Sequence, residues 1–535
     1  MRKPRERGSD GVWISTVAEE DLRARAAAIP DDLPLAGLTF AVKDNIDVAG
    51  MSTTAACPDF AYVAQRTAPV VQRLLDAGAL LVGKTNLDQF ATGLTGARSP
   101  YGAPESVFGG GLIPGGSSSG SAVAVAAGTV DFALGTDTAG SGRVPAAFNG
   151  IVGVKPTRGL LSTLGVVPAC RSLDCVSVFA RDVAQADAVL RIARGLSPDD
   201  PWGRTGSRPL RQPAELRIGT ARSLEFFGDA GQEKAFAAGL SRFSEAVPVD
   251  IEPLLEAGDL LYRGPWVAER LADLGDFLHE HPDSVLPVTR SVLESGLRFT
   301  AADAWKGVHR LRELQAWTDR LWETIDVLVL PTIATTYTYA EIAADPIGRN
   351  LNLGRYTQFA NLLDLAAVTV PNGFTADGRP ASLTLFGPAF SDETLALLAG
   401  AITEAADLMT VAVVGLHLSG EPRNAELTDR GATLVEAART APCYRLYRLP
   451  SGVPGLVRDD GGAAIDVEIW QLPAASVGGL LAGIPAPLSL GRIELADGSE
   501  VTGFLCEAYA AGVAEDITAS GGWRAYRSTP EGQDT

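Results

Sequence analysis

The sequence predicts an α/β fold with a largely parallel or mixed sheet, followed by a separate β-rich domain. Two observations support this prediction. Between residues 38 and 406, short apolar runs alternate with amphipathic helical patterns, the order that is typical of α/β proteins. From residue 411 onward, short strand-like runs follow one another with hairpin signals such as Ala-Asp-Gly-Ser at 496–499. We therefore expect two domains, 1–409 and 410–535.

The elements of the first domain follow from their apolar patterns. Five apolar runs predict buried strands: GLTFAV (37–42), ALLVG (79–83), DFALGTD (131–137), DVLVLPT (326–332) and AAVTVPNGF (366–374). TAPVVQRLLDA (67–77) predicts a helix because its apolar residues recur at helical spacing. The alanine-rich SAVAVAAG (121–128) predicts a second helix that a glycine ends, and residues 390–408 predict the last one.

Composition limits the classes of partner. The 535 residues carry 45 Lys+Arg against 64 Asp+Glu, a net charge of −19, which argues against nucleic acid and against an anionic membrane surface. A few local cations can still bind a small anionic substrate. No run of about 18 apolar residues predicts a membrane span, and the basic start has no apolar region behind it, so we expect a cytoplasmic protein. The five cysteines and four histidines form no zinc pattern, so no metal or cofactor is expected.

Two sequence motifs match nucleotide-binding and hydrolase patterns without the context that these require. Residues 78–85 match GxxxxGK[ST], but the intervening ALLV fits a buried strand, so GKTN is better interpreted as a strand end leading into a helix over 86–92. Residues 116–120 match GxSxG, but FGGGLIPG before them cannot form a central strand. A serine hydrolase with one of the later histidines as base is therefore disfavoured. By chain order alone, the possible bases would be His279, His281 and His309.

Two serine-rich loops and one lysine suggest a different chemistry. In GTDTAGSGR (135–143), glycines on both sides of Ser141 let successive N–H groups point at one spot, so residues 138–141 are the better oxyanion loop and Ser141 the better nucleophile. No histidine lies near either loop. A lysine can act as base if burial lowers its pKa, and Lys43 ends the apolar run LTFAV. From these residues alone, an interior and a surface position for Lys43 are equally open.

Lys43 in KDN, GGSSSGSA at 115–122 and GTDTAGSGR together resemble the amidase-signature family, over roughly residues 35–405. The resemblance implies an amidase-signature fold with a mixed central sheet flanked by helices. It also implies a Ser-cisSer-Lys triad, in which Ser141 attacks the amide and Ser117, after a cis peptide bond, relays the proton to Lys43. Amide hydrolysis would proceed through an acyl-enzyme, and activity would rise with pH as Lys43 loses its proton. The implied oxyanion hole consists of the backbone amides of Thr138, Ala139, Gly140 and Ser141.

Within that family, GGSSSG, TAGSGRVPAAFNG and LLYRGPWVAER (260–270) resemble the allophanate hydrolases. The last segment is expected to be one helix, which places Tyr262 and Arg270 about two turns apart on roughly one face. The resemblance implies that both residues bind substrate. Allophanate is a urea that carries a carboxylate on one nitrogen, so Arg270 would pair with that carboxylate and Tyr262 would add a hydrogen bond.

Four segments of the second domain resemble the C-terminal domain of allophanate hydrolases, a small α+β domain related in fold to γ-glutamyl cyclotransferases: VVGLHLSG (413–420), LSLGRIELADG (488–498), GFLCE (503–507) and GGWRAY (521–526). The resemblance implies that His417 catalyses decarboxylation of N-carboxycarbamate, the product of the first site. Leu416 departs from the pattern, because a small residue is expected before the histidine. The family further implies urea degradation, a homodimer and a functional pairing with a urea carboxylase.

Other functions stay open. One is an amidase acting on biuret, malonamate or aryl amides, with the second domain as a non-catalytic assembly module. An amidotransferase component that acts on charged tRNA is disfavoured by the net charge and by the second domain.

Overall fold

The computed structural model describes residues 11–243, 245–406 and 408–529. It divides into two compact units between Ala401 and Ile402, inside the last helix of the first unit. The two units are described separately below.

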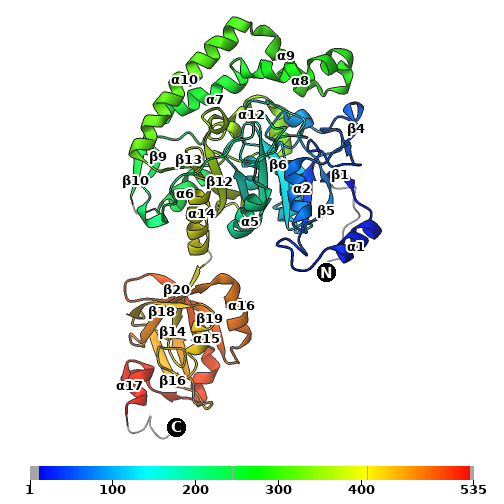
Figure 1. Ribbon diagram of the computed structural model, residues 1–535. Coiled ribbons are helices and arrows are strands. Elements are labelled where there is room, and N and C mark those ends of the chain that lie inside the picture. Colours follow the sequence, from blue (N-terminus) through cyan, green and yellow to red (C-terminus); the bar gives the residue numbers. More distant parts are fainter. Residues whose placement is uncertain (1–10, 244, 407, 530–535) are drawn as a thin grey trace. The chain divides into compact units, whose positions relative to one another are not determined.

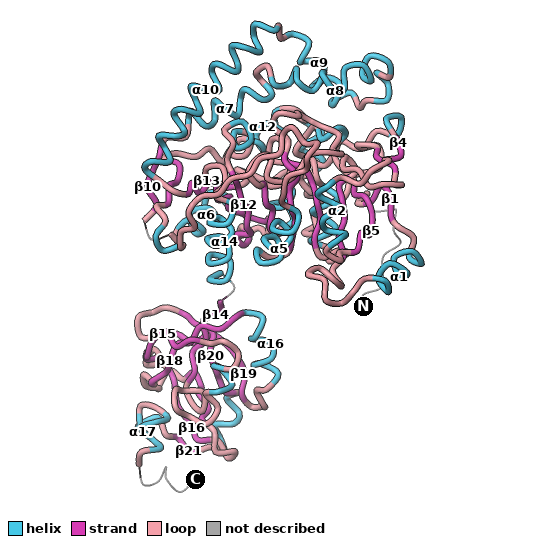
Figure 2. Tube along the Cα trace, in the orientation of Figure 1, coloured by secondary structure: helices cyan, strands magenta, loops and turns pink. Residues whose placement is uncertain are grey.

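The first unit is built on one mixed sheet of eleven strands in the order β1-β5-β2-β6-β8-β7-β12-β13-β11-β9-β10. Helices flank this sheet, as Figure 2 shows. The pairs β2/β5, β2/β6, β9/β10 and β9/β11 are parallel and the other neighbours are antiparallel. The predicted α/β class with a mixed sheet is thus confirmed. The strands are β1 (Trp13–Thr16), β2 (Thr39–Lys43), β5 (Leu80–Thr85), β6 (Phe132–Asp137), β7 (Val152–Lys155), β8 (Cys175–Ala180), β9 (Ile218–Ala221), β10 (Ala246–Val249), β11 (Val327–Pro331), β12 (Ala366–Phe374) and β13 (Pro380–Gly387), besides the small pair β3 (Ser52–Thr53) and β4 (Tyr62–Val63).

Three of the five helices that the sequence predicts are present in the first unit, as α2, α3 and α14. Helices α7 to α10 lie together at one side of the unit, drawn in green in Figure 1. The helices are α1 (Glu19–Ala28), α2 (Pro69–Asp76), α3 (Ser119–Ala126), α4 (Val144–Asn149), α5 (Val183–Ala193), α6 (Ala230–Leu240), α7 (Glu252–Tyr262), α8 (Trp266–Glu280), α9 (Pro287–Glu294), α10 (Ala301–Thr324), α11 (Tyr339–Ala344), α12 (Gly348–Gly354), α13 (Phe359–Leu362) and α14 (Asp392–Ala406).

Helix α3 is buried along nearly its whole length, which explains its alanine-rich sequence. Ala122 and Ala124 are fully buried and pack in one cluster with Ala41 of β2 and Ala133 of β6. Small side chains on both partners allow the helix axis to approach the strands closely, and close approach places the residues before the helix directly against the ends of the strands.

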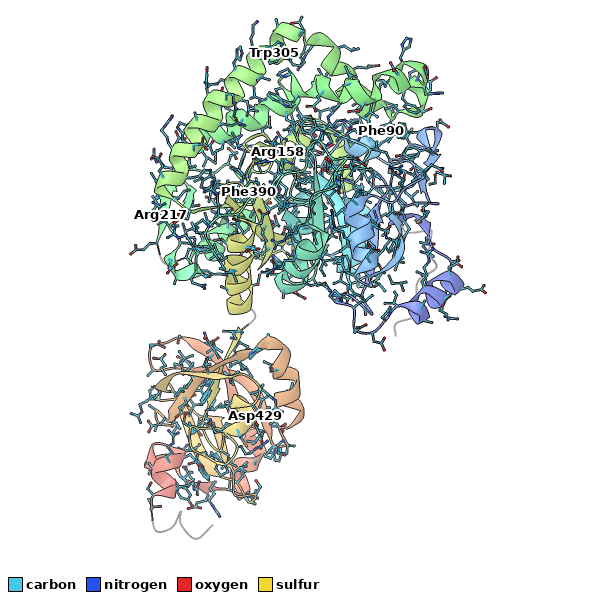
Figure 3. All side chains as sticks on the ribbon, in the orientation of Figure 1. Phe90, Arg158, Arg217, Trp305, Phe390 and Asp429 are labelled. Carbon is cyan, nitrogen blue, oxygen red and sulfur yellow. The ribbon has the colours of Figure 1, made fainter. Side chains whose placement is uncertain are left out.

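The helix predicted over residues 86–92 is wrong. Only a single 3₁₀ turn forms, η2 (Gln89–Ala91), and Phe90 within it has the left-handed φ of 52°; Figure 3 labels this side chain. The amide of Phe90 donates to the carbonyl of Ala55, outside the segment. The Asp88 carboxylate accepts the amides of Thr95, Gly96 and Arg98, and thereby closes a loop instead of capping a helix.

The single helix expected over residues 260–270 is also wrong. Helix α7 ends at Tyr262 and α8 begins at Trp266, with Gly264 and Pro265 between them. Proline has no N–H to donate and disfavours a helical conformation for the residue before it, so the chain breaks there.

The second unit contains two sheets, which confirms the β-rich texture expected of the C-terminal region. Its five-stranded sheet has the order β15-β18-β14-β20-β19 and its three-stranded sheet the order β17-β16-β21. The predicted turn at 496–499 joins β19 and β20 into a hairpin. None of the helices in the described part of the chain has the length and apolar composition that crossing a bilayer requires. The elements are β14 (Leu408–Val413), α15 (Ala425–Thr428), β15 (Thr433–Arg439), β16 (Tyr444–Arg448), β17 (Pro454–Arg458), β18 (Asp466–Pro473), α16 (Ala474–Ala482), β19 (Leu488–Glu494), β20 (Glu500–Cys506), β21 (Glu515–Asp516) and α17 (Trp523–Arg527).

Candidate active site

Lys43, at the end of strand β2, lies fully inside the fold. Its Nζ donates to Ser117 Oγ at 2.7 Å and to Thr136 Oγ1 at 2.8 Å. Burial lowers the pKa of Lys43 from 10.5 to about 7, although the carboxylates of Asp88, Asp174 and Asp137 oppose this shift. Of the two positions that the sequence left open, the interior one is observed, and the side chain can be a neutral amine near neutral pH.

Ser117 follows a cis peptide bond from Gly116 and precedes helix α3. Gly116 cannot be replaced by a larger residue, because a Cβ there would lie 2.2 Å from Asp88 Oδ2 and 2.5 Å from the amide nitrogen of Gly96. The next serine, Ser118, donates its hydroxyl to the carbonyl of Thr136 at 3.1 Å. The serine-rich loop is therefore held against the end of strand β6, where Lys43 also binds.

The loop 138–141, called here the oxyanion loop, is fixed at its base by Asp137. The Asp137 carboxylate accepts the amides of Gly140 at 2.9 Å and Gly142 at 3.0 Å, and forms a fully buried ion pair with Arg143 at 2.9 Å. Burial alone would raise the pKa of Asp137, but Arg143 lowers it overall, so the carboxylate stays ionised. The loop is thus built around a permanent negative charge that its own amides partly neutralise.

The backbone of the oxyanion loop leaves three of the four expected amides free. Gly140 donates to Asp137, whereas the amides of Thr138, Ala139 and Ser141 donate to no acceptor among the described residues. The carbonyl oxygen of Ala139 accepts a hydrogen bond from the hydroxyl of Thr357 at 2.7 Å. Gly140 has a φ of +127°, and a Cβ there would lie 2.3 Å from Thr357 Oγ1, so only glycine fits this turn.

Ser141 is buried on the same loop, with 2% of its surface exposed. Lys43 and Ser117 are in direct contact, but the Ser141 hydroxyl forms no hydrogen bond to either of them in the described part of the chain. The structure therefore joins two of the three expected triad residues and places the third on the loop that carries the free amides.

Arg270 and Tyr262 come together although no continuous helix carries them. Arg270 on α8 is 1% exposed, and its guanidinium lies 5.5 Å from the centre of the Tyr262 ring and 3.5 Å from the Tyr262 hydroxyl. Its Nη1 donates to Thr92 Oγ1 at 2.7 Å, while its Nε has no hydrogen-bond partner among the residues that the structure describes. Among the described residues no carboxylate forms an ion pair with Arg270. The carboxylate of Asp174 interacts electrostatically with Arg270 from beyond ion-pair distance, so an anionic ligand can still form the direct ion pair that a buried guanidinium favours.

His417 lies in the second unit, in the turn after strand β14, and is 7% exposed. Its Nε2 lies 3.4 Å from Glu426 Oε2, and its ring stacks on Phe504 at 4.9 Å. Arg423 holds Glu426 through two hydrogen bonds of 2.6 and 2.8 Å. Burial lowers the pKa of His417 despite the opposing carboxylate of Glu426. The unexpected Leu416 packs against the hydrophobic core of the unit.

Among the side chains that contact the expected residues, Thr136, Thr92 and Asp174 are notable because the sequence analysis did not single them out. Asp174 accepts the hydroxyl of Thr138 on the oxyanion loop. Thr136 is the penultimate residue of the predicted strand DFALGTD, so parallel pairing of β2 with β6 could have suggested it. Thr92 lies in the segment wrongly expected to be helical, and Asp174 has no signal in its local sequence. Within the described residues, no group of three His, Cys, Asp or Glu side chains could hold a metal ion.

Comparison with family models identifies two matches. The amidase model matches residues 8–396, and the model of the allophanate hydrolase C-terminal domain matches residues 409–528.

Three similar proteins align with nearly the whole chain. A urea amidolyase of Saccharomyces cerevisiae is 39% identical over 97% of this chain, but the chain covers only 31% of that relative, so it spans about a third of its length. A second urea amidolyase, from Lachancea kluyveri, is 38% identical over 98% of this chain and 32% of that relative. Among solved structures, Kluyveromyces lactis allophanate hydrolase superposes with a TM-score of 0.72 and 38% identity, covering 97% of this chain and 93% of that one.

Proposed function

The chain belongs to the amidase family and carries an allophanate hydrolase C-terminal domain behind its amidase domain, and from this we propose that it hydrolyses allophanate to ammonia and carbon dioxide in urea degradation. The observation that supports this substrate most directly is the buried Arg270, which has no carboxylate partner among the described residues. The buried contact of Lys43 with Ser117 supports the reaction type.

The first step in this proposal is proton removal from Ser141. Neutral Lys43 takes the proton of Ser117 across their 2.7 Å contact, and Ser117 takes the proton of Ser141. The Ser141 oxygen then forms a bond to the terminal carboxamide carbon. The developing oxyanion is stabilised by the free amides of Thr138, Ala139 and Ser141, while the amide of Gly140 keeps the loop in shape through Asp137.

The intermediate collapses when the carbon–nitrogen bond breaks, and the proton held by Lys43 returns through Ser117 to the leaving nitrogen. Ammonia departs and an acyl-enzyme remains on Ser141. Water, activated by the same relay, hydrolyses this ester. The product is N-carboxycarbamate, a nitrogen that carries two carboxylates.

Substrate selection falls to Arg270 and Tyr262. The guanidinium can form two hydrogen bonds to the carboxylate of allophanate, and the Tyr262 hydroxyl adds a third donor. Urea and biuret lack this carboxylate, so they would leave the buried guanidinium without a directly paired anion. Charge compensation therefore provides the physical reason for discrimination.

The second step is proposed for His417. N-carboxycarbamate loses carbon dioxide when its nitrogen takes up one proton, and carbamate remains. We assign delivery of that proton to His417, and its contact with Glu426 supports this assignment. A homodimer, a cytoplasmic location and a functional pairing with a urea carboxylase belong to the same proposal, and the resemblance to allophanate hydrolases supports them.

The test of the proposed function is ammonia release from allophanate, beside urea, biuret and malonamate, for the native protein and Arg270→Gln. We expect release from urea and biuret, which lack a carboxylate, to be much slower than release from allophanate. Arg270→Gln should lower kcat/KM for allophanate roughly 30- to 1,000-fold, which corresponds to a loss of about 2–4 kcal/mol of transition-state stabilisation. The slow ammonia release from the neutral amides urea and biuret should stay unchanged. Arg263→Gln is the matched control, because this arginine lies at the same break between α7 and α8 but its side chain is 66% exposed. Preference for a neutral amide would contradict the assigned substrate.

His417→Ala is expected to leave ammonia release from allophanate unchanged and to slow carbon dioxide release by roughly 100-fold, the scale of general acid catalysis. Following ¹³C-labelled allophanate by NMR would then show N-carboxycarbamate accumulating. His309→Ala, an exposed histidine of α10, is the control. Unchanged carbon dioxide release with an altered oligomeric state would instead indicate that the second unit is an assembly module.

A further inference from the structure

We infer that the turn at residues 169–174 ties the oxyanion loop to helix α8, so that one hydrogen-bonded element sets the distance between the carboxylate-binding Arg270 and the amides that stabilise the oxyanion. Asp174 and Glu269 are the positioning residues of this element. The inference rests on the proposed function and deepens it, because it concerns how that site recognises both ends of one substrate.

The loop end of the turn is held by Asp174. Its buried carboxylate accepts the hydroxyl of Thr138, the amide of Ala169 at 2.9 Å and the amide of Cys170 at 3.1 Å. Asn361 adds a second tie, because its side-chain amide donates both to the carbonyl of Asp137 at 2.7 Å and to that of Leu173 at 3.1 Å. Two side chains, Asp174 and Asn361, therefore connect the turn to the base of the oxyanion loop by hydrogen bonds.

The helix end of the turn is held by Glu269, the neighbour of Arg270 on α8. Glu269 accepts the amide of Ser172 at 2.7 Å, the hydroxyl of Ser172 at 2.6 Å and the thiol of Cys170 at 3.0 Å. Arg171, also in the turn, forms an ion pair with Asp273 one turn further along α8. Every side chain from Cys170 to Ser172 thus contacts this helix.

The charges along this path support a positioning role. In the part of the chain that the structure describes, neither Asp174 nor Glu269 forms an ion pair with a lysine or arginine side chain. Hydrogen bonds from the turn and, for Asp174, from Thr138 stabilise these carboxylates, and the charge of Arg270 stabilises Asp174 as well. Burial raises the pKa of Asp174 to about 6, so it is mainly ionised above that pH and accepts all its bonds. With Glu269 occupied by the turn, Arg270 stays available for a substrate carboxylate.

The consequence concerns catalysis more than binding. Allophanate is short and rigid, so a fixed spacing between Arg270 and the oxyanion loop places its carboxamide carbon against Ser141. Small misplacements of reacting groups lower the rate strongly, since orientation alone contributes several orders of magnitude to the rate enhancement. Loosening the turn should therefore lower kcat while KM, set mainly by Arg270, changes little.

The experiment measures kcat and KM for allophanate in Thr138→Val, Glu269→Gln and the double variant. We expect each single substitution to lower kcat about tenfold with KM within about threefold, because both cut the same link. The kcat of the double variant should be no more than about threefold below that of the slower single variant, since the first substitution already breaks the connection. Thr138→Ser, which keeps the hydroxyl, should restore kcat, and Asp276→Asn, an exposed carboxylate of α8, should have no effect.

The inference would be overturned if the two decreases in kcat multiplied in the double variant. It would also be overturned if the single substitutions changed KM alone or left kcat unchanged. Failure of the proposed function is recognised separately, because then the native protein itself would release no ammonia from allophanate. In that case hydrogen–deuterium exchange of the peptide covering 138–141 decides: faster exchange in Glu269→Gln than in Asp276→Asn supports the link, and equal exchange refutes it. Thermal melting of each variant shows whether it remains folded.

Discussion

Ser141→Ala is expected to abolish ammonia release from allophanate, with kcat falling by a factor of about 10⁴ or more. In the proposed mechanism the Ser141 oxygen forms the acyl-enzyme, so the substitution removes the nucleophile, while the three free amides of the oxyanion loop and the buried Arg270 remain in place. Binding should therefore persist. Steady-state ammonia assays give kcat, and calorimetric titration of the variant with malonamate, which also carries a carboxylate, checks that the site still binds an anion.

A matched serine of the same motif region controls for the loss of a hydroxyl. Ser119 is equally buried, but its hydroxyl has no hydrogen-bond partner in the described part of the chain. Ser119→Ala therefore removes an unsatisfied polar group and should leave kcat within about threefold. Residual activity above about 1% in Ser141→Ala, or a large loss in Ser119→Ala, would mean that the nucleophile has been assigned to the wrong serine.

Lys43→Met is expected to lower kcat by a factor of about 10³ or more, because Ser117 then has no base to take its proton. For the native protein, kcat/KM should rise with pH through about 7, since burial lowers the pKa of Lys43 to that value and only the neutral amine accepts a proton. The measurement is kcat/KM between pH 5.5 and 9. A native profile that is flat from pH 6 to 9 would refute the role of Lys43 as base.

Stability provides the control for Lys43→Met. Between the lowered pKa of Lys43 in the fold and its ordinary value when unfolded, the unfolded chain binds the extra proton, so native stability rises with pH across that range. The methionine of the variant has no proton to lose, so the variant should lack this slope and be no less stable at pH 7. Lys84 is a second buried lysine for comparison, and it forms an ion pair with Asp44 at 3.1 Å. Lys84→Met would leave the Asp44 carboxylate buried without its partner, which should lower the free energy of unfolding by about 3–5 kcal/mol.

Much of the fold was predictable because its signals are local. Apolar runs such as DFALGTD and AAVTVPNGF became strands β6 and β12, and the alanine-rich segment after the serine loop became α3. The two wrong helices also have local causes that were present in the sequence. Gly264 and Pro265 interrupt one, and Asp88, a residue that readily accepts backbone amides, organises a loop in place of the other.

The site was predictable only in part. The glycine-flanked Ser141 and the serine loop could be recognised from their own residues, and the resemblance to a family connected them to Lys43. Thr92, Thr136 and Asp174 could not be assigned in this way, because each meets its partner across a long stretch of chain. Thr92 contacts a residue 178 positions away, and Thr136 contacts one 93 positions away.

By itself, the sequence determined the fold class, most strands around the site, and the residue types that an amide hydrolase without histidine requires. Only the tertiary structure decided which of these groups are buried and which charges remain uncompensated. Lys43 lies inside because β2 is paired on both edges, by β5 and β6. Among the described residues Arg270 forms no ion pair with a carboxylate, because the neighbouring Glu269 is hydrogen-bonded to a turn about 100 residues away. Burial and charge pairing depend on packing between distant segments, and no local pattern encodes them.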